Sequence, residues 1–228
     1  MSWRESITKA VAPRVTGLAP GATTGFVREA LARAIEGVGP LPGAAAAADA
    51  QLREQNGDVH KAIHEVIENH VRYAGAQGFV TNLGGLVTAP VAIPTNIAGL
   101  ALLQCRMIAG IAHLRGYDLD DPRVRNAVLV CILGEEEVTA LVKVGKIPAP
   151  PMALATAPAH DPANDRVIAS SVATMIIARI AGKRLASTVG RRVPVMGGLV
   201  GAGMDGFATW RVGRYADREL RERPRTQR

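Results

Sequence analysis

A long apolar stretch in the middle of the chain limits most strongly what the chain can fold into. Residues 84–132 are nearly uncharged over about their first 30 positions, where Arg106 is the main interruption. The stretch then passes through a polar turn at Gly116 and continues as a second apolar segment. Apolar and polar residues do not alternate along it as in a strand, so the pattern predicts two helices that form a hairpin.

Two segments, residues 94–113 and 193–210, are long enough to be considered as membrane spans. Gln104 and Arg106 lie near the middle of the first segment, and Asp205 lies in the second. A charged side chain near the centre of a spanning helix costs about 2.5–3.5 kcal/mol, and Gly and Ala offset little of that cost. We therefore expect buried helices of a soluble domain, with peripheral membrane association as the alternative.

Asp205 is unusual because it lies in a helix otherwise made of apolar and small residues. A buried carboxylate needs a partner of opposite charge. Arg106 is the plausible candidate, so the sequence predicts a buried polar pair of Arg106 and Asp205.

The composition favours helices that pack closely together. The chain has 228 residues, of which 48% are hydrophobic but 4% are aromatic, so Ala, Gly, Val, Ile and Leu supply most of the core. A β-sandwich usually carries more aromatic residues and threonine. The predicted fold class is all-α: a single compact multi-helix domain with long, Gly/Ala-rich, packed helices.

Glycine, proline and capping residues divide the chain into expected elements. We expect amphipathic helices within residues 1–36, a helical domain over residues 37–222 and a disordered basic tail at residues 223–228. A Pro-rich stretch at residues 147–163 predicts a long loop or flap. Helices are expected at residues 44–54, from residue 58 onward, and at 95–115, 122–133, 135–145, 163–191 and 194–221.

The positive charge of the chain is concentrated at its C-terminal end. The net charge is +7, yet residues 1–178 hold 15 basic and 16 acidic side chains, whereas residues 179–228 hold 12 basic and 4 acidic ones. A localised basic end suits an anionic partner, although a solvated helix face with a basic tail explains it equally well. The candidate residues for an anionic membrane or partner are Lys183, Arg184, Arg191, Arg192, Arg211, Arg214 and Arg218.

A cluster of histidines offers a metal site as an alternative. His60, His64 and Glu68 recur every four residues, so they lie on one helix face where two imidazoles could chelate a metal. The pattern is not the HExxH motif, because position 68, where the second histidine of that motif would stand, is Glu68, and the next histidine is His70. A polar helix face is the alternative interpretation, and no cofactor is expected.

Other notable residues have structural explanations. Acidic side chains in a first helical turn, such as the triplet that begins at Glu135, are stabilised by the helix dipole. Cys105 and Cys131 lie in apolar segments and indicate buried thiols. The N-terminus has no apolar segment typical of a signal peptide. We expect a cytoplasmic protein that could lie at the inner face of the plasma membrane.

Three groups of residues, taken in order, resemble the EcsC family. Gly84-Gly85 leads to Pro90 or Pro94 and the long apolar helix. That helix ends in a motif that runs from Ile111-Ala112 through Gly116-Tyr117-Asp118 to Pro122 and Arg125. A late segment runs from Val193-Pro194 through Gly197-Gly198 to Gly201-Ala202. The resemblance covers about residues 35–222 and is of a bacterial, actinobacterial type.

The resemblance implies a helical protein without an established reaction. The family is named for a gene beside a bacterial ABC transporter, so a membrane transport complex is an implied partner. The function expected first is a non-enzymatic, peripherally membrane-associated protein that could bind lipid or another apolar ligand. The alternative is a metal-dependent, hydrolase-like enzyme at His60, His64 and Glu68. Nucleic-acid binding is disfavoured by the few aromatic residues, and the sequence leaves the oligomeric state open.

Overall fold

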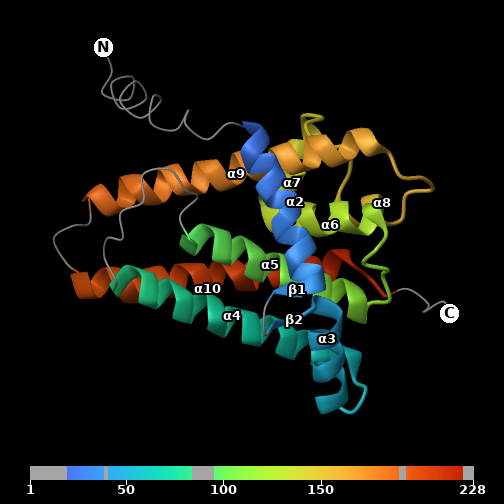
Figure 1. Ribbon diagram of the computed structural model, residues 1–228, viewed down its shortest axis with the longest axis horizontal. Coiled ribbons are helices and arrows are strands. Elements are labelled where there is room, and N and C mark those ends of the chain that lie inside the picture. The colour runs from blue at the N-terminus through green and yellow to red at the C-terminus, as the bar shows by residue number, and fades with distance from the viewer. Residues whose placement is uncertain (1–19, 39–40, 84–94, 190–193, 223–228) are drawn as a thin grey trace.

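The computed structural model describes residues 20–38, 41–83, 95–189 and 194–222, and most of them are helical (Figure 1). The predicted all-α fold class is confirmed. The helices are α2 (Pro20–Glu36), α3 (Ala44–Glu54), α4 (Val59–Leu83), α5 (Thr95–Leu114), α6 (Pro122–Leu133), α7 (Glu135–Lys143), α8 (Pro151–Ala155), α9 (Pro162–Val189) and α10 (Pro194–Glu219). The two short strands β1 (Gly37–Val38) and β2 (Leu41–Pro42) pair antiparallel between α2 and α3.

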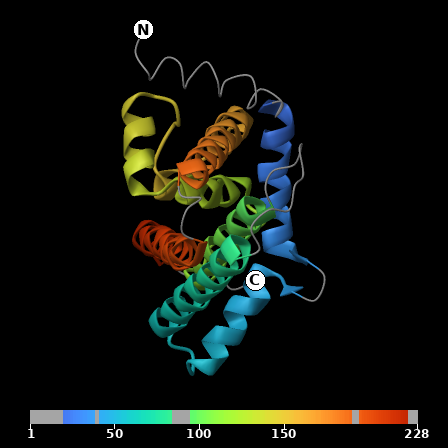
Figure 2. The same ribbon diagram turned by 90° about the vertical axis from the view of Figure 1, so that its left-hand side faces the viewer.

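Helix α5 lies in the middle of the molecule and contacts α2, α3, α4, α6 and α10 (Figures 1 and 2). Residues 107–112 of α5 are buried, and so are residues 126–133 of α6. The apolar hairpin predicted from the sequence is therefore the interior of the domain, over the part that the structure describes.

The turn between α5 and α6 is formed by a glycine and by capping residues that can be recognised in the sequence. Gly116 has a φ of 87°, and its N–H donates to the His113 carbonyl at 2.9 Å. Such a left-handed glycine ends a helix by satisfying its last carbonyls. Asp121 then caps α6 by accepting from the Arg123 backbone N–H at 2.8 Å, and Pro122 occupies the first helical position.

The two long helices α4 and α10 lie side by side (Figures 1 and 2). Glycines of α10 face α4 at the contact. A Cβ added at Gly206 would lie 3.6 Å from the Val71 carbonyl oxygen, and one at Gly213 would lie 3.0 Å from Ile67 Cγ1. Close helix approach through small residues, as the sequence predicts, holds at these positions.

The Pro-rich stretch at residues 147–163 differs from the predicted long loop. It contains helix α8, which packs against α6. Ile147, Pro151 and Leu154 are buried there. Proline at the first helical position needs no N–H donor, so a Pro-rich stretch can start a short helix when its apolar side chains have a surface to cover.

Helix α2 belongs to the same core as the helices that follow it. Val27, Leu31 and Ala34 are buried with residues of α5 and α6 in one cluster. The described part of α2 therefore packs into the core of the helical domain, and the division of the chain at residue 36 stays a prediction. The expected helices before residue 20, the landmarks from Gly84 to Pro94 and the tail after residue 222 lie outside the described residues.

Candidate functional site

One face of α10 presents large apolar side chains to solvent. Met204, Phe207 and Trp210 are 67%, 60% and 41% exposed. The rings of Phe207 and Trp210 stack with their centroids 6.0 Å apart. Three arginines follow at spacings of three and four residues, which keeps them on the same side of the helix. We call these six residues the α10 outer face: Met204, Phe207, Trp210, Arg211, Arg214 and Arg218.

Two of these arginines pair with acidic residues of α7. Arg211 Nη2 lies 2.7 Å from Glu136 Oε1, and Arg218 donates to the Glu135 carboxylate. Both pairs join segments far apart in the chain, since 75 and 83 residues separate their members. The acidic triplet that the sequence explains by the helix dipole alone therefore also neutralises part of the basic end.

Arg214 has a weaker partner. Its Nη1 lies 3.5 Å from Asp217 Oδ2, one turn along its own helix. The other oxygen of Asp217 accepts from Arg115 Nη2 at 2.6 Å, so that carboxylate is already held by a closer guanidinium. Of the three arginines of the α10 outer face, Arg214 is thus the one whose charge is least compensated by a direct contact.

A cleft of about 670 Å³ lies between α7 and α10. One wall carries the carboxylates of α7 and the other carries the three arginines of the α10 outer face. Its lining also includes apolar side chains and Trp210, which links the cleft to the exposed aromatic pair. The lining residues are Leu133, Gly134, Glu135, Glu136, Glu137, Met175, Ala208, Trp210, Arg211, Val212, Arg214 and Arg218.

The structure thus gathers three of the seven predicted anion-binding residues at one cleft. Lys183 and Arg184 belong to the last turns of α9, but their side chains lie outside the described residues. Arg191 and Arg192 also lie outside them. For these four residues, the role assigned from the sequence stays a prediction.

The predicted metal ligands lie along one side of α4. His60 and His64 are exposed, and Glu68 is partly buried. Among the described residues, no three histidine, cysteine, aspartate or glutamate side chains come together in a way that could hold a metal ion. No described residue of another helix adds a metal ligand to His60, His64 and Glu68. The metal site stays a prediction without support from the fold.

His70, the histidine outside the predicted triad, is buried instead. Its Nδ1 donates to the Val66 carbonyl oxygen at 2.7 Å. Burial, against the opposing effect of the hydrogen bond to Val66 and with a smaller contribution from the nearby charge of Arg106, lowers the pKa of His70 to about 4. His70 is therefore a neutral, structural residue at pH 7.

Arg106 and Asp205, the predicted buried pair, are placed on α5 and α10. Arg106 is partly buried and donates to the Pro42 carbonyl oxygen, and burial lowers the pKa of its guanidinium. Asp205 is buried. Direct pairing between them stays a prediction. A polar contact between α5 and α10 in this region runs from Gln104 Nε2 to Thr209 Oγ1, at 3.4 Å.

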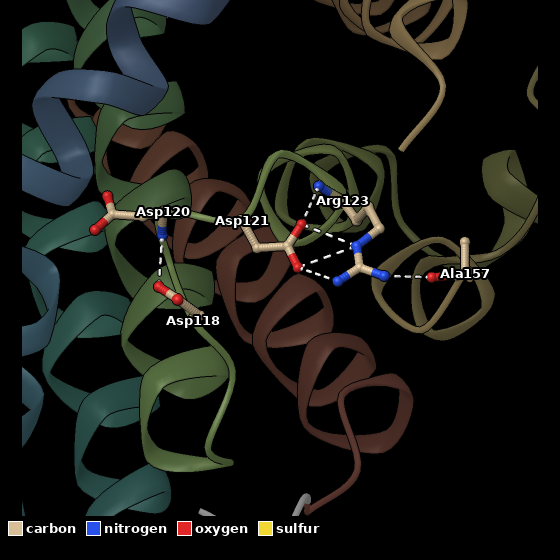
Figure 3. Close-up of polar contacts among 5 residues, drawn as sticks. All are labelled: Asp118, Asp120, Asp121, Arg123 and Ala157. Atoms are coloured by element: carbon tan, nitrogen blue, oxygen red, sulfur yellow. Dashed lines mark hydrogen bonds and ion pairs between the residues drawn. The ribbon is translucent and has the colours of Figure 1, made fainter. Parts of the chain in front are cut away.

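The polar turn of the predicted motif is a structural clamp (Figure 3). Asp121 accepts from Arg123 Nε at 3.0 Å and from its Nη2 at 2.6 Å. The hydrogen bonds to Arg123 lower the pKa of Asp121, so the carboxylate stays ionised. Arg123 also donates to the Ala157 carbonyl, which ties the α8–α9 connection to α6. Asp118 accepts the N–H of Asp120 at 3.0 Å.

Arg125, the last residue of the motif, makes similar local contacts. Its Nε donates to the Leu119 carbonyl at 2.8 Å, and its Nη2 lies 3.2 Å from Asp120 Oδ1. The motif residues therefore stabilise the turn between α5 and α6. None of these contacts aims a side chain at the cleft between α7 and α10.

Sequence reasoning missed the apolar half of the α10 outer face. Its signal is the three-residue spacing of Met204, Phe207 and Trp210 after a Gly-rich first half of the helix. This spacing does not distinguish an exposed face from a buried one, because the same spacing occurs in a buried stripe. The acidic partners of Arg211 and Arg218 could not be predicted from the sequence, because only folding brings α7 beside α10.

A model of the EcsC protein family matches residues 7–224. The chain belongs to the EcsC protein family. The match begins well before residue 35, where the resemblance starts, and this agrees with the packing of α2 into the common core. A search of curated proteins and a search of solved structures give no match. Family membership therefore assigns no reaction to any residue of this EcsC protein.

None of the described helices of the EcsC protein has an 18-residue window apolar enough to cross a membrane.

Proposed function

We propose that this EcsC protein binds peripherally to anionic membrane surfaces through the α10 outer face. One observation carries the proposal: three large apolar side chains are exposed in a row beside three arginines on the same helix face. Apolar and aromatic side chains enter the boundary between headgroups and acyl chains, while arginines contact lipid phosphates. Among the described residues, no burial in the core requires Met204 or Phe207 to be apolar, since both side chains are mostly exposed.

The charge distribution supports the same orientation. The C-terminal 50 residues carry 12 basic and 4 acidic side chains, so the end that contains α10 would be drawn to a negative leaflet. In a bacterial cell this leaflet would be the inner face of the plasma membrane. Lys183, Arg184, Arg191 and Arg192 would add long-range attraction. A membrane transport complex is a further partner that such a location would allow.

Vesicle binding tests the proposal. The chain has two tryptophans, so Trp3→Phe leaves Trp210 as a single fluorescent reporter. We expect co-sedimentation and a blue shift of Trp210 emission with vesicles that contain phosphatidylglycerol, but not with pure phosphatidylcholine. Binding should weaken as salt rises, because exposed charges are screened. Phe207→Ser should weaken binding about tenfold through the loss of apolar burial.

Val144 provides a matched control, because it is an exposed apolar residue outside α10. Val144→Ser should leave binding unchanged. The proposal is wrong if anionic vesicles do not bind at low salt, or if Phe207→Ser and Val144→Ser have equal effects.

A further inference from the structure

We propose that the cleft between α7 and α10 is a binding site for the phosphate group of an anionic lipid headgroup. The carboxylates of Glu135 and Glu136 accept from two of the arginines that would hold the phosphate, Arg218 and Arg211 respectively. The inference rests on the proposed membrane function and adds to it a specific site and a built-in competitor.

The geometry of the two ion pairs indicates the ligand chemistry. A guanidinium recognises carboxylate and phosphate oxygens with the same arrangement of N–H donors. Glu136 Oε1 lies 2.7 Å from Arg211 Nη2, so this carboxylate marks a position that a phosphate oxygen could take. Glu135 marks a second position at Arg218. Arg214 lies between these two arginines in the helix and adds a third guanidinium, whose own partner, Asp217, is 3.5 Å away.

The carboxylates are held weakly enough to be exchanged. The side chains of Arg211 and Glu136 are 50% and 85% exposed, and those of Arg218 and Glu135 are 52% and 59% exposed. Ion pairs with this much solvent contact contribute little to stability, because water and salt screen them. A dianionic or surface-concentrated phosphate can therefore displace them without unfolding α7.

The position of the cleft favours a lipid as the source of the phosphate. Trp210 lines the cleft and stacks on Phe207, so the site for the charged group continues directly into the exposed apolar surface. A headgroup in the cleft would leave acyl chains beside Phe207 and Met204. A free phosphate compound would gain nothing from that apolar surface.

The acidic triplet of α7 supplies a matched experiment. Glu136→Gln and Glu137→Gln each remove one negative charge from the same helical turn at the same cleft. Glu136 pairs with Arg211, whereas Glu137 forms no ion pair with the described residues. We expect Glu136→Gln to tighten binding to phosphatidylglycerol vesicles roughly two- to fivefold, since it frees an arginine. Glu137→Gln should change binding by less than about twofold.

A second arm uses sn-glycerol 3-phosphate in solution, measured by calorimetry with the same two variants. It should bind more weakly than the vesicles but show the same order, with Glu136→Gln tighter than Glu137→Gln. Arg211→Gln should weaken binding in both arms. Melting temperatures of all variants should stay close to that of the wild type, because the substituted side chains are exposed.

The outcomes separate the two proposals. Equal effects of Glu136→Gln and Glu137→Gln in both arms would overturn the phosphate site, while vesicle binding that depends on Phe207 would keep the membrane function. If vesicles do not bind but glycerol phosphate distinguishes the two variants, the cleft binds phosphate, but the membrane function and the assignment of a lipid as the ligand are both overturned. If neither ligand binds any variant, both proposals are overturned.

Discussion

The interior hairpin of α5 and α6 and the outer face of α10 use the same kinds of residue in opposite ways. Met107 on α5 is fully buried and lies beside Gly213 of α10, whereas Met204 on α10 is 67% exposed. Burial of a methionine side chain stabilises the fold, and exposure of one does not. The interior methionine therefore contributes to the fold, whereas the apolar side chains of the outer face are exposed, as the proposed membrane binding requires.

The arginines of the two regions differ in the same way. Arg115, just after α5, is 10% exposed and donates to Asp217 at 2.6 Å. Arg211 is 50% exposed and donates to Glu136 at a similar distance, 2.7 Å. Similar distances therefore do not imply equal contributions, because water screens the exposed pair more strongly than the enclosed pair.

The largest expected effect compares the two methionines. Met107→Ala should lower the free energy of unfolding by about 2–5 kcal/mol, because it removes buried methylene groups and leaves a cavity. Met204→Ala should change it by less than about 0.5 kcal/mol but weaken binding to anionic vesicles. Urea denaturation followed by circular dichroism measures the first quantity. Equal losses of stability would contradict the contrast between the two regions.

Much of the interior could be predicted from the sequence because its signals are local. Gly116 ends α5, and Asp121 with Pro122 starts α6, as their positions in the chain predict. Helix α8 could not be predicted, because its stability depends on the burial of Ile147 and Leu154 against α6, which no local pattern reveals.

The candidate site was less predictable than the fold. The count of basic residues pointed to Arg211 and Arg218, but their acidic partners lie 75 and 83 residues away in the chain. The sequence could not show that α7 and α10 face each other across a cleft. It also could not separate an exposed apolar stripe from a buried one, since both follow helical spacing.

A second prediction compares two histidines of α4. The pKa of His70 is lowered to about 4, below the ordinary value of 6.5, chiefly by burial. The unfolded chain therefore takes up a proton first as pH falls, so the contribution to stability is complete above about pH 6.5 and is lost toward pH 4. Between pH 7 and pH 5 this loss amounts to about 2 kcal/mol.

His70→Gln keeps a side-chain donor for the Val66 carbonyl but cannot be protonated, so it should remove most of this pH dependence. His64→Gln, on the exposed side of the same helix, serves as the control and should retain the wild-type profile. Urea denaturation at a series of pH values measures both. Identical profiles for the two variants would mean that His70 is accessible to water and not part of the interior.

The smallest expected effect concerns the exposed ion pair. Arg211→Gln should change the free energy of unfolding by less than about 1 kcal/mol, and 0.5 M NaCl should reduce even that difference. Arg115→Gln should cost more, because it leaves the carboxylate of Asp217 partly enclosed without its closest cation. Thermal unfolding at low and high salt distinguishes them. If Arg211→Gln destabilises the protein as much as Arg115→Gln, the pair with Glu136 is a structural contact, and an incoming phosphate could not displace it at low cost.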